Sequence, residues 1–284
     1  MRDAALQGLA IGFFDGVHLG HQAILRGASA ALTFRNHPLT VLAPEKAPRL
    51  IMSCEERVAA IKACGVTDVT VLDFTRELAD LSPDEFAIRY LFAAPGHMEP
   101  WRIFCGENWR FGKGGAGDAD WLRARGIEVA VVPYAEYGGE RISSSRIRRC
   151  LEQGEVADAN AMLGRPYAVR GAQIKGKGLG GAIGCPTVNL QLSSSAYSPR
   201  LPFGVYEVAA AGGRGIANYG LAPTMGDQAW RKPVLEVHFL SALPALGADE
   251  VKVDVLRFIR PEKKFDSVDD LKRQIASDCA KILL

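Results

Sequence analysis

Residues 12–21 read GFFDGVHLGH and continue an apolar run that begins at residue 9. The run 9–14 ends at Asp15-Gly16, a common turn signal, and a helix is expected to begin near Leu19. This order predicts a strand, a tight turn and a helix, which together direct backbone N–H groups at whatever lies above the sheet. Gly20 lets an anion approach the backbone closely. We therefore expect an anion-binding site at this turn.

The two histidines of this stretch, His18 and His21, are three residues apart at the start of the expected helix, so both can reach one phosphate. This arrangement suits attack on the α-phosphate of a nucleoside triphosphate, where imidazoles stabilise negative charge without forming a covalent bond. A single histidine there would more often cap or pack. The pair directly after a strand and an Asp-Gly turn favours the functional interpretation.

The rest of the first half alternates apolar runs with helix signals. Ser53 with Glu56 forms a capping box, and Ser82 with Glu85 forms another, with proline at the first helical position. Strands that alternate with helices predict parallel βαβ units and a sheet covered on both faces. The further expected strands are residues 30–34, 69–74, 102–105 and 127–132.

The second half reads mostly as strands with Gly/Pro turns, which predicts a small barrel or sandwich. Valines at 251, 253 and 255 alternate with polar residues, as in a half-buried antiparallel strand. A final helix capped by Ser267 and Asp270 closes the chain. We place the domain boundary between residues 163 and 164. The expected strands are residues 167–174, 205–209, 215–219, 234–240 and 251–259.

The composition argues against nucleic-acid-binding, disulfide-stabilised, zinc-binding and membrane-spanning proteins. The net charge is +2, from 34 basic and 32 acidic residues, so we expect no nucleic-acid partner. Six scattered cysteines without a CxxC pair argue against a disulfide framework or a zinc site and favour the cytoplasm. No run of 18 apolar residues occurs, so we expect no membrane partner.

A second polar stretch, ISSSRIR at residues 142–148, begins another expected helix. Ser144 and free N–H groups at the helix start, with Arg148 one turn later, could hold a triphosphate tail. From these residues alone, a plain N-cap with solvated arginines is an equally good interpretation. The position after the last expected strand of the α/β half favours phosphate binding.

Taken together, the motifs resemble the bifunctional bacterial riboflavin kinase/FAD synthetase family, in the same order along nearly the whole chain. The resemblance rests on GFFDGVHLGH at 12–21, FRNHP at 34–38, GENWRFG at 106–112, ISSSRIR at 142–148, LGRPY at 163–167, GCPTVNL at 184–190, FGVYEV at 203–208, NYGLAPT at 218–224 and LEVHFL at 235–240.

This resemblance implies a Rossmann-like α/β/α nucleotidyltransferase domain at residues 1–163 and a small antiparallel riboflavin kinase-like barrel with a terminal helix at residues 164–284. The barrel would transfer the γ-phosphate of ATP to riboflavin and give FMN. The first domain would join FMN to AMP from a second ATP, giving FAD and pyrophosphate. Both reactions would need Mg²⁺, and we expect a monomer or a weak homo-oligomer.

The resemblance also assigns residues of the first domain. His18 and His21 would be catalytic. Asn108, Trp109 and Phe111 would hold the flavin ring, since aromatic side chains stack well on a planar isoalloxazine. The residues that would bind ATP are Gly12, Phe14, Asp15, Gly20, Ser144 and Arg148.

In the kinase half, residues 176–184 are rich in glycine but lack the spacing of a Walker loop. Gly176, Gly178 and Gly180 would wrap ATP phosphates. Thr187 and Asn189 offer a hydroxyl and an amide oxygen, which suit Mg²⁺ beside phosphates, and the resemblance gives them both roles. The tetrapeptide 186–189 alone favours a β-turn.

Glu236 is the expected general base for the 5′-hydroxyl of riboflavin. The alternation of residues 235–239 places its side chain opposite Leu235, Val237 and Phe239. The pattern alone favours a solvent-exposed glutamate without a function, whereas the resemblance favours a glutamate in the kinase site.

The chain departs from the family at several positions. Phe13 stands where the family usually has asparagine, and Gly181 and Ala222 each stand where it usually has arginine. The Asp-Phe and Leu-Tyr-Gly sequence motifs that the family has after the Glu236 strand are absent from residues 240–250. Two alternatives therefore remain open: an FMN adenylyltransferase with a degraded kinase domain, and a catalytically inactive flavin-binding or regulatory protein.

Overall fold

The computed structural model describes residues 8–92, 102–174, 187–192, 201–221, 233–240 and 250–283. The chain forms two compact units, Met1–Ser144 and Ser145–Leu284. Helices α7 (Ser144–Gln153) and α8 (Val156–Leu163) precede the expected boundary at residue 164, and apart from Ser144 they belong to the second unit. Gly176, Gly178, Gly180, Gly181 and Ala222, and residues 241–249, lie outside the described residues.

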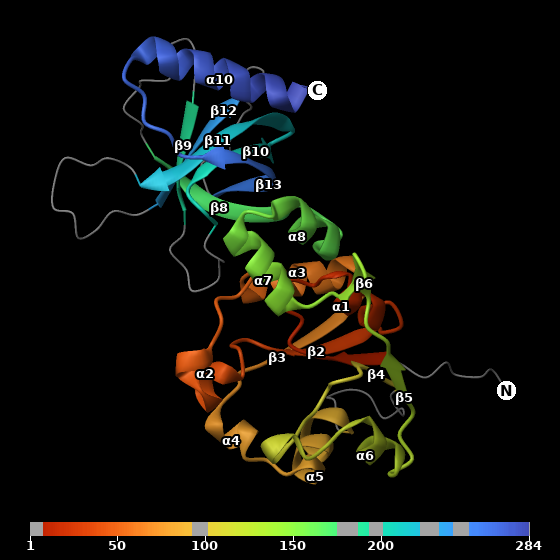
Figure 1. Ribbon diagram of the computed structural model, residues 1–284. Coiled ribbons are helices and arrows are strands. Elements are labelled where there is room, and N and C mark those ends of the chain that lie inside the picture. The colour runs from red at the N-terminus through yellow and green to blue at the C-terminus, as the bar shows by residue number, and fades with distance from the viewer. Residues whose placement is uncertain are drawn as a thin grey trace. The chain divides into compact units, whose positions relative to one another are not determined.

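The first unit is built on a five-stranded parallel sheet with strand order β3-β2-β1-β4-β5 (Figure 1). The α/β prediction is confirmed. The first strand ends at Ile11, three residues earlier than expected, because the chain turns at Gly12 and Phe14 adopts a positive φ of 56°. The strands are β1 (Gly8–Ile11), β2 (Ala30–Phe34), β3 (Asp68–Leu72), β4 (Arg102–Gly106) and β5 (Val129–Val132).

Helices cover both faces of this sheet (Figure 1). Leu9 and Ile11 of β1 pack into one apolar cluster, whereas Ala10 packs into the cluster on the other face with Leu25 and Ile61. That second face carries α1 (Leu19–Leu25) and α3 (Cys54–Ala63), and the first carries α4 (Arg76–Ala79), α5 (Pro83–Phe86), the π-helical turn η2 (Ala87–Leu91) and α6 (Ala119–Arg123).

Both predicted capping boxes are present, with Ser53 beginning α3 and Ser82 beginning α5. The shorter elements of this unit are α2 (Leu39–Leu42), η1 (Pro44–Lys46), η3 (Lys113–Gly115), β6 (Glu136–Tyr137) and β7 (Glu140–Arg141).

The second unit contains a closed six-stranded antiparallel barrel, which confirms the barrel prediction. Around the barrel the strands follow the order β10-β11-β12-β9-β8-β13. Their bounds are β8 (Tyr167–Ile174), β9 (Thr187–Leu192), β10 (Gly204–Ala210), β11 (Gly213–Leu221), β12 (Pro233–Phe239) and β13 (Glu250–Pro261).

Strand β9 corrects the sequence-based interpretation of the segment around Thr187, for which the residues alone favoured a turn. The segment pairs with β12 on one side and with β8 on the other. Val188 and Leu190 are buried, whereas Thr187 and Asn189 are half-buried, so the strand alternates with period two. This alternation places Thr187 and Asn189 on one face of the strand.

Helix α10 (Val268–Leu283) packs against the barrel (Figure 1). The backbone N–H of Asp270 donates to Ser267 Oγ over 3.1 Å, as the predicted cap requires. Ile275 and Cys279 pack with Val205 and Ile216 of the barrel. An ion pair of 2.8 Å between the half-buried Arg260 and the fully buried Asp278 also joins β13 to the helix.

Candidate active sites

His18 and His21 lie together after the carboxyl end of β1. His18 is the N-cap residue of α1, and its Nδ1 accepts from the backbone N–H of His21 over 3.3 Å. The two rings stack with centroids 3.6 Å apart and an interplanar angle of 17°. The sequence stretch therefore forms one imidazole pair, which can offer hydrogen bonds to a single anionic group.

The turn before this pair is strained. Phe14 and Val17 have φ values of 56° and 40°, in a region that a β-branched residue such as valine rarely adopts. Gly16, with φ of 82°, lies between them. The Asp15 carboxylate, which is 2% exposed, accepts the backbone N–H of Ile51 over 2.9 Å. The contact of Asp15 with Ile51 therefore stabilises the strained turn. Strained backbone of this kind persists only where the neighbouring structure enforces it.

Three residues that the resemblance assigns to ATP binding, Phe14, Gly20 and Gly12, pack around the imidazole pair. Phe14 is 1% exposed and turns its ring edge-on to His21, with centroids 5.4 Å apart. A Cβ at Gly20 would come within 3.2 Å of the His18 ring, and one at Gly12 within 2.9 Å of the Phe14 ring. These positions support the imidazole pair through packing.

Ser144 reaches the same turn, because its hydroxyl donates to the backbone carbonyl of Asp15 over 2.9 Å. Ser144 begins α7, and Arg148 follows one turn later in that helix, where its guanidinium lies 3.4 Å from Ser145 Oγ. Sequence reasoning thus placed Ser144 beside the histidine turn, although its hydroxyl is used there for a backbone contact.

His21 is electrostatically unusual. Burial, the neighbouring His18 and the Arg57 guanidinium, in that order of importance, hold the pKa of His21 well below its ordinary value of 6.5. Its Nδ1 is buried and has no hydrogen-bond partner among the described residues. A neutral imidazole carries one N–H, which can donate a hydrogen bond to a phosphate oxygen.

The three residues assigned to the flavin differ in exposure. Asn108 is exposed and Trp109 is half-buried, whereas Phe111 is 6% exposed. Phe111 stacks on Trp109 with centroids 4.8 Å apart and meets Trp121 edge-on at 5.3 Å. The ring of Phe111 therefore belongs to the core, and Trp109 is the accessible aromatic surface of this segment.

In the barrel, Thr187, Asn189 and Glu236 meet on adjacent strands. The hydroxyl of Thr187 donates to Glu236 Oε1 over 2.9 Å, and Asn189 is the direct cross-strand partner of Glu236. All three are half-buried and lie opposite the apolar barrel interior. Their hydroxyl, amide and carboxylate oxygens are donors that Mg²⁺ accepts, so the described residues fit that ion.

Two family models cover most of the chain: FAD synthetase matches residues 3–146, and riboflavin kinase matches residues 163–283. The chain belongs to the bifunctional riboflavin kinase/FAD synthetase family. It is 34% identical to the bifunctional riboflavin kinase/FMN adenylyltransferase of Listeria monocytogenes, over 95% of this chain and 89% of that protein. The protein of the same description from Escherichia coli is also 34% identical, over 95% of this chain and 90% of that protein.

A solved structure from Streptococcus pneumoniae, described as a macrolide-efflux protein, matches with a TM-score of 0.82 and 31% identity. The match covers 97% of this chain and 93% of that one. Among the described residues of this family member, no helix combines the length and the apolar character needed to cross a bilayer.

Sequence reasoning missed two polar residues, Asn218 and Glu262, which lie beside the barrel site in this member of the riboflavin kinase/FAD synthetase family. Asn218 of β11 is the cross-strand partner of Glu236 on the side opposite Asn189. Its Nδ2 lies 3.5 Å from Glu262 Oε1. Asn218 belongs to the motif NYGLAPT, which was the sequence signal that could have found it; its position opposite Glu236 follows only from the register of β11 against β12.

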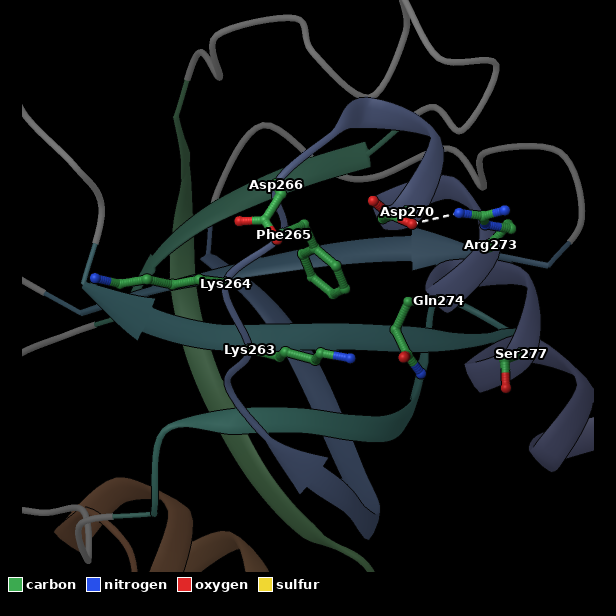
Figure 2. A pocket seen from close by; sticks show the side chains of 8 residues that line it. All are labelled: Lys263, Lys264, Phe265, Asp266, Asp270, Arg273, Gln274 and Ser277. Carbon is green, nitrogen blue, oxygen red and sulfur yellow. Dashed lines mark hydrogen bonds and ion pairs between the residues drawn. The ribbon is translucent and has the colours of Figure 1, made fainter.

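A surface cavity of about 410 Å³ lies between the segment after β13 and helix α10 (Figure 2). Figure 2 shows Phe265 beside it, with Lys263 nearby and the ion pair of Asp270 and Arg273 at one end. None of the sequence-predicted site residues lines this cavity, and its volume is in the range of small-ligand pockets.

Proposed function

We propose that this chain makes both flavin nucleotides: its second unit phosphorylates riboflavin to FMN, and its first unit adenylylates FMN to FAD. Support comes from the two family models in one chain and from the polar clusters formed in both units. The observation that carries the proposal is that each cluster assembles from residues the family motifs contain, across two strands in the barrel and around one turn in the sheet.

In the phosphorylation, the 5′-oxygen of riboflavin attacks the γ-phosphorus of ATP and the bond to the β-phosphate oxygen breaks, releasing ADP. Glu236 accepts the proton of the hydroxyl, and its contact with Thr187 fixes the direction of the carboxylate. Thr187 and Asn189 would hold Mg²⁺, which when bound neutralises phosphate charge. Positioning of the hydroxyl supplies much of the remaining rate.

In the adenylyl transfer, a phosphate oxygen of FMN attacks the α-phosphorus of ATP and the bond to the β-phosphate oxygen breaks, releasing pyrophosphate. His18 and His21 donate hydrogen bonds to the α-phosphate, where negative charge builds up in the transition state. Trp109 offers the stacking surface for the isoalloxazine, with Asn108 beside it, and Phe111 supports the Trp109 ring from the core.

We also propose that ATP contacts Gly12, Asp15, Gly20, Ser144 and Arg148 for the adenylyl transfer and the glycine-rich segment 176–180 for the phosphorylation. The functional division would lie between residues 163 and 164. The protein would act in the cytoplasm as a monomer or weak homo-oligomer, with riboflavin, FMN and ATP as its small-molecule partners.

The test is chromatography of purified full-length chain mixed with riboflavin, ATP and Mg²⁺. FMN that appears first and FAD that follows supports the proposal. FAD formed only when FMN is supplied would reduce the function to adenylyl transfer alone. If neither product forms while flavin fluorescence is still quenched on mixing, the chain is a flavin-binding protein instead.

A further inference from the structure

Arg57 of α3 is the largest fully buried side chain among the described residues, with 0% exposure. Its Nη2 donates to the carbonyl of Phe34 and, over 3.1 Å, to the carbonyl of Arg35, where β2 ends. Its Nε and Nη1 are buried and have no hydrogen-bond partner among the described residues. A charged group is therefore held at the carboxyl end of the sheet with part of its hydrogen-bonding capacity unused.

The ring of Phe13 lies against this guanidinium. The Arg57 Cζ is 4.2 Å from the ring centroid, within the range of a cation–π contact. The same ring meets His37 edge-on, with centroids 4.9 Å apart. Phe13 follows Gly12 in the strained turn, so Arg57 contacts a side chain of the segment that leads into the imidazole pair.

Packing alone does not account for a charged residue at this position. A buried guanidinium with unpartnered N–H groups is destabilising, and an apolar side chain of similar length is often as good or better in a core. What an apolar side chain cannot supply is a fixed positive charge close to a reacting phosphate. Such a charge stabilises a transition state without reorganising during the reaction.

We propose that Arg57 is a positioning residue of the adenylyl-transfer site, which orders the Gly12–Gly16 turn through Phe13 and adds positive potential where charge develops on the α-phosphate. The inference rests on the proposed adenylyl transfer by the first unit. It also gives Phe13 a role at the position where the family usually has asparagine.

The charges around the imidazole pair fit this role. His21 faces the His18 ring, the edge of Phe14 and the charge of Arg57 on α3. Burial lowers the pKa of Arg57, and Cys54, Asp15 and Glu55 act in the opposite direction. An arginine stays protonated at neutral pH, so its charge helps to keep His21 neutral.

The experiment compares Arg57→Met, which removes the charge, with Arg57→Lys, which keeps it but loses the planar fork. FAD formation from supplied FMN, ATP and Mg²⁺ is measured across pH, and FMN formation from riboflavin is measured in the same samples. We expect Arg57→Met to lower kcat for FAD formation by about 10²-fold, with a smaller change in KM. The acid limb of its pH profile should move to higher pH, because His21 loses a cationic neighbour.

Arg57→Lys should lower kcat by about 10-fold and leave the acid limb in place, since the charge remains but the planar guanidinium that contacts the two carbonyls and the Phe13 ring is lost. FMN formation should be unchanged in both variants. A matched control is Arg102→Met, which removes a guanidinium 5.4 Å from the Phe104 ring at the opposite end of the sheet. That control should leave both reactions unchanged.

An acid limb that stays in place in Arg57→Met would overturn the inference. If Arg57→Met does not fold, the inference is tested with Arg57→Lys. A wild-type kcat for FAD formation in that variant overturns the inference. A wild-type chain that forms no FAD from FMN would instead overturn the proposed adenylyl transfer itself, so the two failures are distinguishable.

Discussion

The hydroxyl of Thr187 donates a hydrogen bond of 2.9 Å to the carboxylate of Glu236, from strand β9 to strand β12. The two strands pair directly, with Asn189 opposite Glu236. The contact fixes one oxygen of the carboxylate and places a hydroxyl, an amide and an acid on one face of the barrel wall.

Replacing Thr187 by valine keeps the shape of the side chain and removes the hydroxyl. A hydrogen bond to a charged group contributes about 1.5–3 kcal/mol, so we expect FMN formation to fall by roughly 10–10²-fold. FAD formation from supplied FMN should stay at the wild-type rate. Steady-state kinetics of both reactions provide the measurement. Thr70→Val, at an exposed threonine of β3, is the control for the substitution itself, and undiminished phosphorylation in Thr187→Val would remove the contact from the site.

Replacing His21 by alanine removes one of the two stacked imidazoles. We expect FAD formation to slow by roughly 10²–10³-fold, as for the loss of one charge-stabilising donor. FMN formation should be nearly unaffected, because Thr187, Asn189 and Glu236 lie in the other unit. Rates from riboflavin and from FMN are compared in one preparation. Equal damage to both reactions would contradict the assignment of separate sites.

The depressed pKa of His21 links the stability of the first unit to pH. Below its ordinary pKa of 6.5, an unfolded His21 binds a proton that the folded imidazole does not, because the pKa of the folded imidazole is lowered. The free energy of unfolding should therefore fall as the pH drops through this value, and stop falling below the lower pKa of the folded state. Denaturant unfolding between about pH 7.5 and pH 5 measures the slope. His21→Phe should flatten it, and an identical slope in that variant would show that other groups cause it.

Asp278 is fully buried and joins α10 to the barrel through Arg260, with Gln274 Nε2 donating to its Oδ1 over 3.0 Å. Asp278→Ala leaves the half-buried Arg260 guanidinium without its carboxylate, and we expect a loss of up to about 3 kcal/mol, at the low end for buried pairs because the guanidinium is partly exposed. Calorimetry should show a lower Tm for the second unit. Asp269→Ala, at an exposed position of the same helix, should change Tm far less, and equal effects would contradict a structural role for the buried pair.

Sequence patterns predicted the elements whose signals are local. The capping boxes at Ser53 and Ser82 and the alternation of Val251, Val253 and Val255 each depend on residues within one turn or one strand. Strand β9 was missed because proline and a glycine-rich segment precede it, and turn signals outweighed the alternation of Val188 and Leu190.

Features that depend on tertiary contacts could not be predicted in this way. Arg57 follows two glutamates, a context typical of an exposed helix face, and its burial depends on carbonyls at the end of β2. Phe111 reads as a candidate ligand contact within its motif, and only its packing on Trp121 places its ring in the core. The imidazole pair was found from spacing, whereas the strain at Val17 was not, because valine carries no signal for positive φ.

Closure of the barrel has a consequence for behaviour at high concentration. Each of its six strands hydrogen-bonds to a neighbour on both sides, so none offers a free row of N–H and C=O groups to another molecule. The parallel sheet is open, and β3 and β5 are its outermost strands. The strands β6 and β7 also have free edges but contain only two residues each, so among the described strands self-association through an added strand is expected first at β3 or β5. Charged substitutions on those two strands are the first choice for keeping concentrated samples monodisperse.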